Sequence, residues 1–213
     1  MYSVDCQMFL VFCFAYLIGS FPTAFLIGKS KNIDIRRYGS GNVGATNSAR
    51  VLGKKIALAV LLVDILKGFL PLYLLNIYFP NLESKEIYIL IAGFSVLIGH
   101  IFPLWLRFKG GKGVATMSGV LMALSPLQLG LALAIFTIVL IISKMVSMAS
   151  IVSVFSMILT FFLSFSYEES YPILYFYCCS FVLILFAHKG NIKRIFSGTE
   201  SKVGHNFFQK VNL

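Results

Sequence analysis

A polar loop between two apolar segments carries the residue types best suited to chemistry. It reads Gly39-Ser40-Gly41-Asn42-Val43-Gly44-Ala45-Thr46-Asn47, and Arg50 follows shortly after it. Glycines let backbone N–H groups approach a ligand, hydroxyls and amides donate hydrogen bonds, and an arginine neutralises an anion. Thr46 or Asn47 would also cap a helix that begins there. The loop therefore predicts a phosphate site, with candidate residues Gly39, Ser40, Gly41, Asn42, Gly44, Thr46, Asn47 and Arg50.

Two further polar patches lie later in the chain. Gly110-Gly111-Lys112-Gly113 again stands between apolar runs. Its glycines let the backbone pack closely around whatever Lys112 holds, whereas Arg107 and Lys109 are interpreted as anchors that snorkel to lipid headgroups. The third patch contains His188, Asn191, Arg194, Gly198, Thr199 and Glu200. The further candidate site residues are Gly110, Gly111, Lys112, Gly113, His188, Asn191 and Glu200.

Several familiar ligand motifs do not fit these patches. Gly39 to Gly44 matches G-x-G-x-x-G, but a dinucleotide-binding turn needs a preceding strand, and a Walker loop needs a lysine where Ala45 stands. The sequence contains no His-x4-Asp pair, no Gly-x-Ser-x-Gly elbow and no aspartate-rich magnesium pattern. We therefore predict no metal and no cofactor.

Composition places the three patches at a membrane. The 213 residues are 58% hydrophobic and 12% charged, with a mean hydropathy of +0.87, whereas a soluble domain is roughly 25% charged. Such a chain cannot cover a water-facing surface, so we predict an integral membrane protein. The net charge of +10 comes from basic residues in short loops beside apolar runs. This pattern is typical of membrane topology and argues against a nucleic-acid partner.

The apolar runs predict about seven membrane helices. They fall at 8–28, 56–79, 87–106, 114–143, 145–166 and 172–187. The run at 114–143 exceeds the roughly twenty residues that a span needs, and Pro126 favours a break within it. We therefore divide it into 114–124 and 127–143. The predicted fold is all-α and polytopic, with a single transmembrane domain over residues 1–213.

Positive charge orients these predicted helices. With the N-terminus outside, every lysine and arginine except Lys67 and Lys85 falls on the inner side, as the positive-inside rule requires. The acidic residues on the outer side are Asp5, Glu83, Glu86, Glu168 and Glu169. The three polar patches and the C-terminus are therefore predicted to be cytoplasmic, where residues distant in sequence can converge on one site.

Two charged residues lie inside the second predicted helix. Asp64 and Lys67 are three residues apart on one helix face, and either would cost about 2.5–3.5 kcal/mol unpaired at mid-membrane. We therefore predict that they pair with each other, with either a structural role or a role in orienting a loop residue. His100, which precedes Pro103, is interpreted as a satisfied polar residue rather than a catalyst.

With these motifs the chain resembles the bacterial acyl-phosphate:glycerol-3-phosphate acyltransferases. The first matching region runs from Asp34 to Arg50 and the second from Gly99 to Thr116. The third comprises 147–150 with His188, Asn191, Arg194, Gly198 and Glu200. The resemblance covers nearly the whole chain. It implies a seven-helix fold with its site on the cytoplasmic face, which agrees with the topology predicted from charge.

The resemblance also implies a reaction. An acyl group would pass from acyl phosphate to the 1-hydroxyl of glycerol 3-phosphate, giving lysophosphatidic acid and phosphate in the first acylation of bacterial phospholipid synthesis. By similarity, Ser40, Arg50 and Lys112 bind phosphate and stabilise the leaving group, while His188 and Asn191 position glycerol 3-phosphate. Either His188 or a substrate phosphate accepts the proton. The implied location is the bacterial inner membrane, among lipids, with the enzyme that makes acyl phosphate as a partner.

Two other functions compete with this hypothesis. A transporter or exchanger of small phosphate esters would also use glycine loops with arginine and lysine, but the broken segments of transporters usually meet near mid-membrane. Here the polar loops are predicted on one face. A scaffold that binds anionic lipid through basic loops leaves the glycines unexplained. The acyltransferase is the preferred hypothesis, and the transporter is the alternative.

Overall fold

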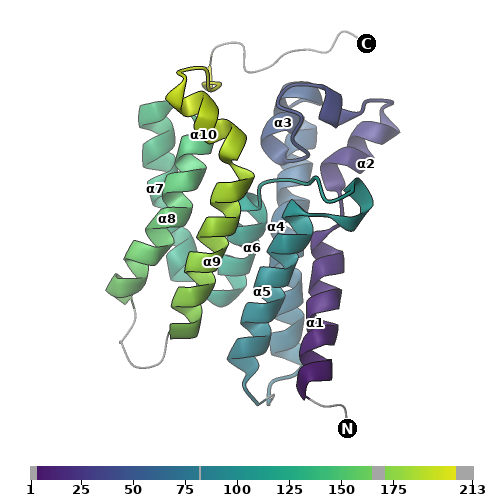
Figure 1. The fold of residues 1–213 in the computed structure, drawn as a ribbon, viewed down its shortest axis with the longest axis vertical. Helices are drawn as coiled ribbons and strands as arrows, with labels where there is room; N and C mark the ends of the chain where they lie inside the picture. Colours follow the sequence, from purple (N-terminus) through teal and green to yellow (C-terminus); the bar gives the residue numbers. More distant parts are fainter. Residues whose placement is uncertain (1–3, 82, 165–170, 205–213) are drawn as a thin grey trace. The chain divides into compact units, whose positions relative to one another are not determined.

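Every regular element that the structure describes is a helix (Figure 1). The structure is a computed structural model that describes residues 4–81, 83–164 and 171–204. Its helices form two compact units, Met1–Leu124 and Ser125–Leu213. The predicted all-α fold is confirmed. The assignment of the whole chain to a single domain stays a prediction.

The N-terminal unit pairs long apolar helices and carries two polar loops between them. Its elements are α1 (Val4–Gly19), α2 (Thr23–Ser30), the 3-10 turn η1 (Ile35–Arg37), α3 (Ala45–Val51), α4 (Lys54–Tyr78), α5 (Lys85–Ile101), the 3-10 turn η2 (Leu104–Leu106) and α6 (Val114–Leu124). Helix α4 packs along α6, and α1 packs along α5. The first polar loop joins α2 to α3, and the second joins η2 to α6.

Glycines at the helix contacts explain how closely these pairs pack. A Cβ atom at Gly68 of α4 would collide with the backbone carbonyl of Thr116 in α6, and one at Gly119 of α6 would collide with that of Ile65. Gly99 of α5 meets the backbone of α1 in the same way. Small residues of this kind let membrane helices approach each other and gain dispersion contacts. The α4–α6 and α1–α5 pairs therefore form the frame that carries the polar loops.

The first apolar run, predicted as one helix over 8–28, contains a break. Helix α1 ends at Gly19 and α2 begins at Thr23. The intervening Pro22 has no N–H to donate and its ring disfavours helix in the residue before it. The residues Asp5–Ser30 together are still long and apolar enough to cross a membrane. The break exposes backbone groups that the neighbouring helices must satisfy.

The C-terminal unit has three apolar helices and a short basic one. These are α7 (Pro126–Ser143), α8 (Val146–Ser164), α9 (Tyr171–Ala187) and α10 (Lys189–Phe196). Helix α8 packs against both α7 and α9, and its buried face is lined by Ser147, Ser150, Ser153, Ser156 and Thr160. Hydroxyls on a buried helix face are tolerable because they can donate to carbonyls one turn back. Helix α10 bends by 65° from α9.

The structure supports the membrane prediction without fixing the number of spans. The predicted break near Pro126 is confirmed, because α6 ends at Leu124 and α7 begins at Pro126. Among the described residues, four stretches are long and apolar enough to cross a membrane, or up to five if α9 and α10 form one bent span. Helix α6 and residues Val146–Phe162 are shorter apolar helices. Seven spans and their orientation stay predictions, and Glu168 and Glu169 lie outside the described residues.

Candidate functional site

The first polar loop is folded around the side chain of Asn47. This residue is only 1% exposed. Its Oδ1 accepts a hydrogen bond from the backbone N–H of Ser40 at 2.9 Å, and its Nδ2 donates to the carbonyls of Tyr38 at 3.1 Å and Ile35 at 3.3 Å. Both hydrogens of the amide are therefore used inside the loop. The side chain of Ser40 lies at the exposed surface that this fold creates.

Glycines make the tight turn around Asn47 possible. Gly39 and Gly41 have φ values of +61° and +71°, in the left-handed region that glycine adopts without strain. A Cβ atom at Gly39 would also collide with Oδ1 of Asn47. Helix α3 then begins at Ala45, with Gly44 at the N-cap position and no side-chain cap. The prediction that Thr46 or Asn47 caps this helix is wrong, since both lie within its first turn and Asn47 is committed to the loop.

An apolar cluster supports the loop from below. It contains Ala24, Ile35, Val43, Val60 and Leu106, which come from α2, η1, the loop, α4 and η2. Burial of such side chains is the main driving force that holds a loop against its frame. Arg50 and Thr46 on α3 are half-buried, and Oδ1 of Asn42 is shielded from solvent with no hydrogen-bond partner among the described residues. Of the predicted ligand-binding side chains in this loop, Ser40 is therefore the exposed one and the others are partly covered.

Arg36 has a different role from Arg50. Its guanidinium donates to both oxygens of Asp34, at 2.9 and 2.8 Å, and lies 4.7 Å from the ring centroid of Phe25. These hydrogen bonds from Arg36 lower the pKa of Asp34 to about 2. The side chain of Asp34 also caps η1 by accepting from the backbone N–H of Arg36. Arg36 and Asp34 therefore stabilise the entry to the loop.

The second polar loop is fastened to the end of α5. The N–H of Gly110 donates to the carbonyl of Ile101, and that of Gly111 donates to the carbonyl of His100, each at 3.0 Å. Gly113 has a φ of +86° and leads directly into α6. Lys112 is half-buried in this loop, whereas Lys109 is exposed. The backbone N–H groups of Gly110 and Gly111 are thus used within the fold. The side chain of Lys112 is the partly buried cation of this loop.

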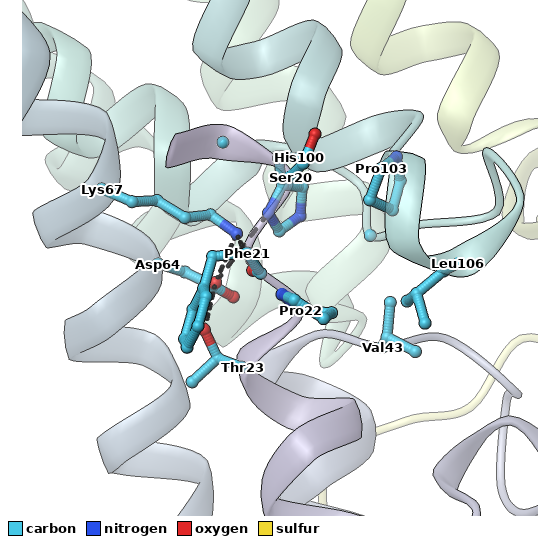
Figure 2. A pocket seen from close by; sticks show the side chains of 12 residues that line it. Ser20, Phe21, Pro22, Thr23, Val43, Asp64, Lys67, His100, Pro103 and Leu106 are labelled. Atoms are coloured by element: carbon cyan, nitrogen blue, oxygen red, sulfur yellow. Dashed lines mark hydrogen bonds and ion pairs between the residues drawn. The ribbon is translucent and has the colours of Figure 1, made fainter. Parts of the chain in front are cut away.

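Asp64, Lys67 and His100 form a buried cluster (Figure 2), and the ring of His100 lies against Gly111 of the second loop. Nζ of Lys67 is 2.9 Å from Oδ1 of Asp64, and both side chains are nearly inaccessible. The predicted pairing is confirmed. Nδ1 of His100 lies 3.9 Å from the same Oδ1, yet it makes no hydrogen bond within the described part of the chain. The interpretation of His100 as a satisfied polar residue stays a prediction for this nitrogen.

In the C-terminal unit, His188 lies at the bend between α9 and α10. It is 1% exposed, and its Nδ1 lies 2.9 Å from the carbonyl of Ile184. Because a carbonyl oxygen can only accept, Nδ1 carries the hydrogen, and in the neutral ring Nε2 keeps its lone pair. The contact with the carbonyl of Ile184 therefore favours the tautomer in which Nε2 can act as an acceptor.

Glu200 collects three hydrogen bonds next to Asn191. Its Oε1 accepts from Oγ of Ser147 at 2.7 Å and from Nδ2 of Asn191 at 2.6 Å, and its Oε2 accepts from Nε of Arg194 at 2.7 Å. Burial raises the pKa of Glu200, but these three hydrogen bonds and the charge of Arg194 outweigh burial and lower it. The carboxylate thus joins the segment after α10 to α8 and α10.

The structure therefore groups the predicted site residues within each unit. In the N-terminal unit it brings Gly39, Ser40 and Asn47 into direct contact, and it brings Gly111 against the ring of His100. In the C-terminal unit it joins Asn191 to Glu200. Sequence reasoning missed the link between His100 and Gly111, since no local pattern specifies that a ring and a distant glycine will touch. The convergence of the three patches stays a prediction.

Known proteins are similar in sequence to nearly the whole chain. A profile of the family described as glycerol-3-phosphate acyltransferase matches residues 9–198. The glycerol-3-phosphate acyltransferase of Fusobacterium nucleatum is 44% identical over 195 residues, which cover 90% of this chain and 97% of the relative. That of Bacillus subtilis is 41% identical over 196 residues, which cover 91% and 96%.

A solved structure is similar as well. The crystal structure of PlsY (YgiH), an integral membrane glycerol 3-phosphate acyltransferase, in its glycerol 3-phosphate form matches with a TM-score of 0.84 and 35% identity. The match covers 93% of this chain and 96% of that one. The lysophosphatidic acid form of the same protein matches with a TM-score of 0.81.

Proposed function

We propose, because this chain belongs to the glycerol-3-phosphate acyltransferase family, that it transfers an acyl group from acyl phosphate to the 1-hydroxyl of glycerol 3-phosphate. The products are lysophosphatidic acid and inorganic phosphate. The family match over residues 9–198 is the observation that supports glycerol 3-phosphate as the acceptor and acyl transfer as the reaction class. The choice of acyl phosphate as the donor is what the resemblance of the three motif regions implies, and the chemistry of the polar loops supports it.

An acyl phosphate suits a site built from cations and hydrogen-bond donors. It is a mixed anhydride whose leaving group is phosphate, so the protein has no need to form a covalent intermediate. The acceptor hydroxyl attacks the carbonyl carbon, the bond between that carbon and the phosphate oxygen breaks, and the phosphate leaves. Catalysis then consists of alignment and of charge stabilisation for two anionic groups.

The half-buried cations of the N-terminal unit support this assignment. Arg50 and Lys112 each stand in a glycine-containing polar segment, with limited contact with water. A cation in such surroundings stabilises a phosphate more strongly than an exposed one does, because less of its field is screened. We assign Arg50, Lys112 and the exposed hydroxyl of Ser40 to phosphate binding and to stabilisation of the leaving group.

His188 and Asn191 are assigned to glycerol 3-phosphate. The lone pair on Nε2 of His188 can accept the hydrogen of the 1-hydroxyl. A phosphate oxygen of the substrate can take the same proton, because the second pKa of a phosphomonoester is about 6. The two candidate acceptors of the proton are Nε2 of His188 and a phosphate oxygen of the substrate. They are distinguished by measuring how kcat depends on pH in a His188→Gln variant.

Other predicted site residues have supporting roles in this proposal. Asn47 uses both amide hydrogens to hold the first loop, and Glu200 uses its carboxylate to hold Asn191 and Arg194. A carboxylate would repel a phosphate, so Glu200 positions its neighbours and does not bind the anion itself. The glycines of the two loops provide the turns that position the phosphate-binding side chains. They are Gly39, Gly41, Gly44, Gly110, Gly111 and Gly113.

The proposed surroundings follow from the proposed substrates. An acyl chain partitions into the bilayer while its phosphate stays at the interface, so an integral membrane enzyme can take its donor from the membrane surface. We place the protein in the bacterial cytoplasmic membrane, with its polar loops facing the cytoplasm. The acyl phosphate must come from an enzyme that exchanges the carrier of an activated acyl group for phosphate.

Parallel donor assays test the proposal. Purified protein in detergent or lipid is given glycerol 3-phosphate with either acyl phosphate or acyl-CoA, and lysophosphatidic acid is quantified. We expect product from acyl phosphate and none from acyl-CoA. Product from acyl-CoA alone would overturn the donor assignment and keep the reaction class. An absence of product from both, together with uptake of glycerol 3-phosphate into sealed vesicles, would favour the transporter.

A further inference from the structure

The cluster of Asp64, Lys67 and His100 is buried yet connected to both polar loops of the N-terminal unit. The three residues are 2%, 7% and 6% exposed, and Figure 2 shows their side chains pointing toward one another. The pair of opposite charges offsets the cost of placing either charge in an apolar medium. Stability alone does not account for the ion pair, since replacing a buried pair by apolar residues of similar volume is often neutral or stabilising.

One connection runs through His100 to the second polar loop. The carbonyl of His100 accepts the N–H of Gly111 at 3.0 Å. On the other side, the ring of His100 lies so close to Gly111 that a Cβ atom there would collide with Nε2. The position of the ring thus determines where the backbone next to Lys112 can lie. Nδ1 of the same ring faces Asp64, so the ring stands between the ion pair and the loop.

A second connection runs to the break between α1 and α2. Nζ of Lys67 donates to the carbonyl of Phe21 at 3.2 Å. Oγ1 of Thr23 is 3.5 Å from Oδ1 of Asp64. The ion pair thereby satisfies backbone and side-chain groups that the break leaves without helical partners. Helix α2, which starts at Thr23, leads into the first polar loop.

We propose that Asp64, Lys67 and His100 are positioning residues that hold both polar loops of the N-terminal unit in one arrangement for binding phosphate. The cluster fixes the second loop through the ring of His100 and the start of α2 through Phe21 and Thr23. This inference rests on the proposed function, because it assigns these residues to the same phosphate-binding loops. It extends to His100 and to both loops the orienting role that the sequence left open for Asp64 and Lys67.

The space beside the cluster argues for positioning and against direct contact with substrate. A cavity of about 10 Å³ lies there, lined by residues that include Ser20, Asp64, Lys67, His100 and Gly111. With the loops as they stand in this structure, the space has room for about one water molecule. The cluster therefore acts through the loops that it holds.

Neutralising the ion pair in two steps tests the proposal. Thermal unfolding and the kinetic constants for both substrates are measured for Asp64→Asn, Lys67→Met and the double variant. The control is Lys85→Met, which removes a charge at the start of α5. Each single variant should be destabilised, because one buried charge is left without its partner. The double variant should be more stable than either single variant, although it lacks the bond to the carbonyl of Phe21, and it should still lose at least tenfold in kcat/KM. Recovery of both stability and kcat/KM would overturn the proposal.

The contact between His100 and Gly111 provides a second test that does not depend on the ion pair. Gly111→Ala should lower kcat/KM at least tenfold in the wild type, because its methyl group collides with the ring. In a His100→Ala background the same change should cost less than threefold, since the ring is gone. Equal losses in both backgrounds would show that the two residues act independently and would overturn the proposal. This test stays decisive if the double variant of the ion pair does not fold.

The tests separate this inference from the proposed function. If the wild-type protein makes no lysophosphatidic acid from either donor, the proposed function fails before any variant is compared. If the wild type is active and the variants behave as independent structural changes, only the positioning role fails.

Discussion

At the scale of single residues, the two lysines of the second polar loop differ in their surroundings. Lys112 is half-buried between glycines, whereas Lys109 is exposed. We predict that Lys112→Ala lowers kcat/KM by a factor of a thousand or more in folded protein, because a charge-assisted contact with phosphate is lost. Lys109→Ala should stay within about twofold of the wild type. The test is to measure the kinetic constants of both variants, with melting temperatures as a check on folding. Equal losses of kcat/KM in the two variants would contradict the assignment of Lys112 to phosphate binding.

Glu200 gives a prediction for stability against pH. Its folded-state pKa lies below the ordinary value of 4.5, so the carboxylate contributes stability that is fully present above pH 4.5 and is lost as the pH falls through the lowered pKa. The melting temperature of the wild type should therefore fall more steeply below pH 4.5 than that of Glu200→Gln. At neutral pH, Glu200→Gln should be less stable by about 1–3 kcal/mol, because hydrogen bonds from Ser147, Asn191 and Arg194 are weakened. Parallel pH slopes for the two proteins would contradict this account.

At the scale of helices and loops, the close approach of α4 and α6 gives a prediction with a matched control. Gly119→Ala places a methyl group against the backbone carbonyl of Ile65, and the two helices must move apart at a cost of about 1–3 kcal/mol. A methyl group at Gly130 in α7 meets nothing within 4 Å. Gly130→Ala should therefore leave the melting temperature unchanged or raise it. A similar loss in both variants would mean that glycine itself, and not its contact, matters at position 119.

The elements that local sequence specifies were predicted more accurately than the contacts between them. Apolar runs located the long helices, and Pro126 located the break between α6 and α7. The break before Thr23 was missed although Ser20 and Pro22 stand within the run, because 8–28 has about the length of a single span and was read as one helix. Periodicity reports burial and spacing, and it does not report where a helix bends within a uniformly apolar segment.

The candidate site shows the same division. Residue types in the glycine-rich loops indicated phosphate chemistry, and the spacing of Asp64 and Lys67 indicated their pairing. The inward role of Asn47 was not predictable, because its partners are the carbonyls of Ile35 and Tyr38, which meet the amide only after the loop has folded. A polar side chain in a loop has the same sequence signature whether it faces a ligand or the backbone.

At the scale of the whole molecule, the distribution of charge predicts the orientation of the chain in the membrane. Single-cysteine variants Lys85→Cys and Lys109→Cys, in a background where Cys6, Cys13, Cys178 and Cys179 are replaced by serine, report the side on which each position lies. A membrane-impermeant maleimide added to intact cells should label position 85 at once. It should label position 109 only after the membrane is opened. The reverse pattern would invert the predicted topology.

The proposed reaction depends on direct transfer of the acyl group to glycerol 3-phosphate. The measurement that tests it most directly mixes purified protein with acyl phosphate alone and then adds glycerol 3-phosphate, while phosphate and lysophosphatidic acid are both followed. We predict no phosphate above spontaneous hydrolysis in the first stage and equal amounts of the two products in the second. A burst of phosphate equal to the amount of enzyme before glycerol 3-phosphate is added would contradict direct transfer, because it would reveal a covalent acyl-enzyme.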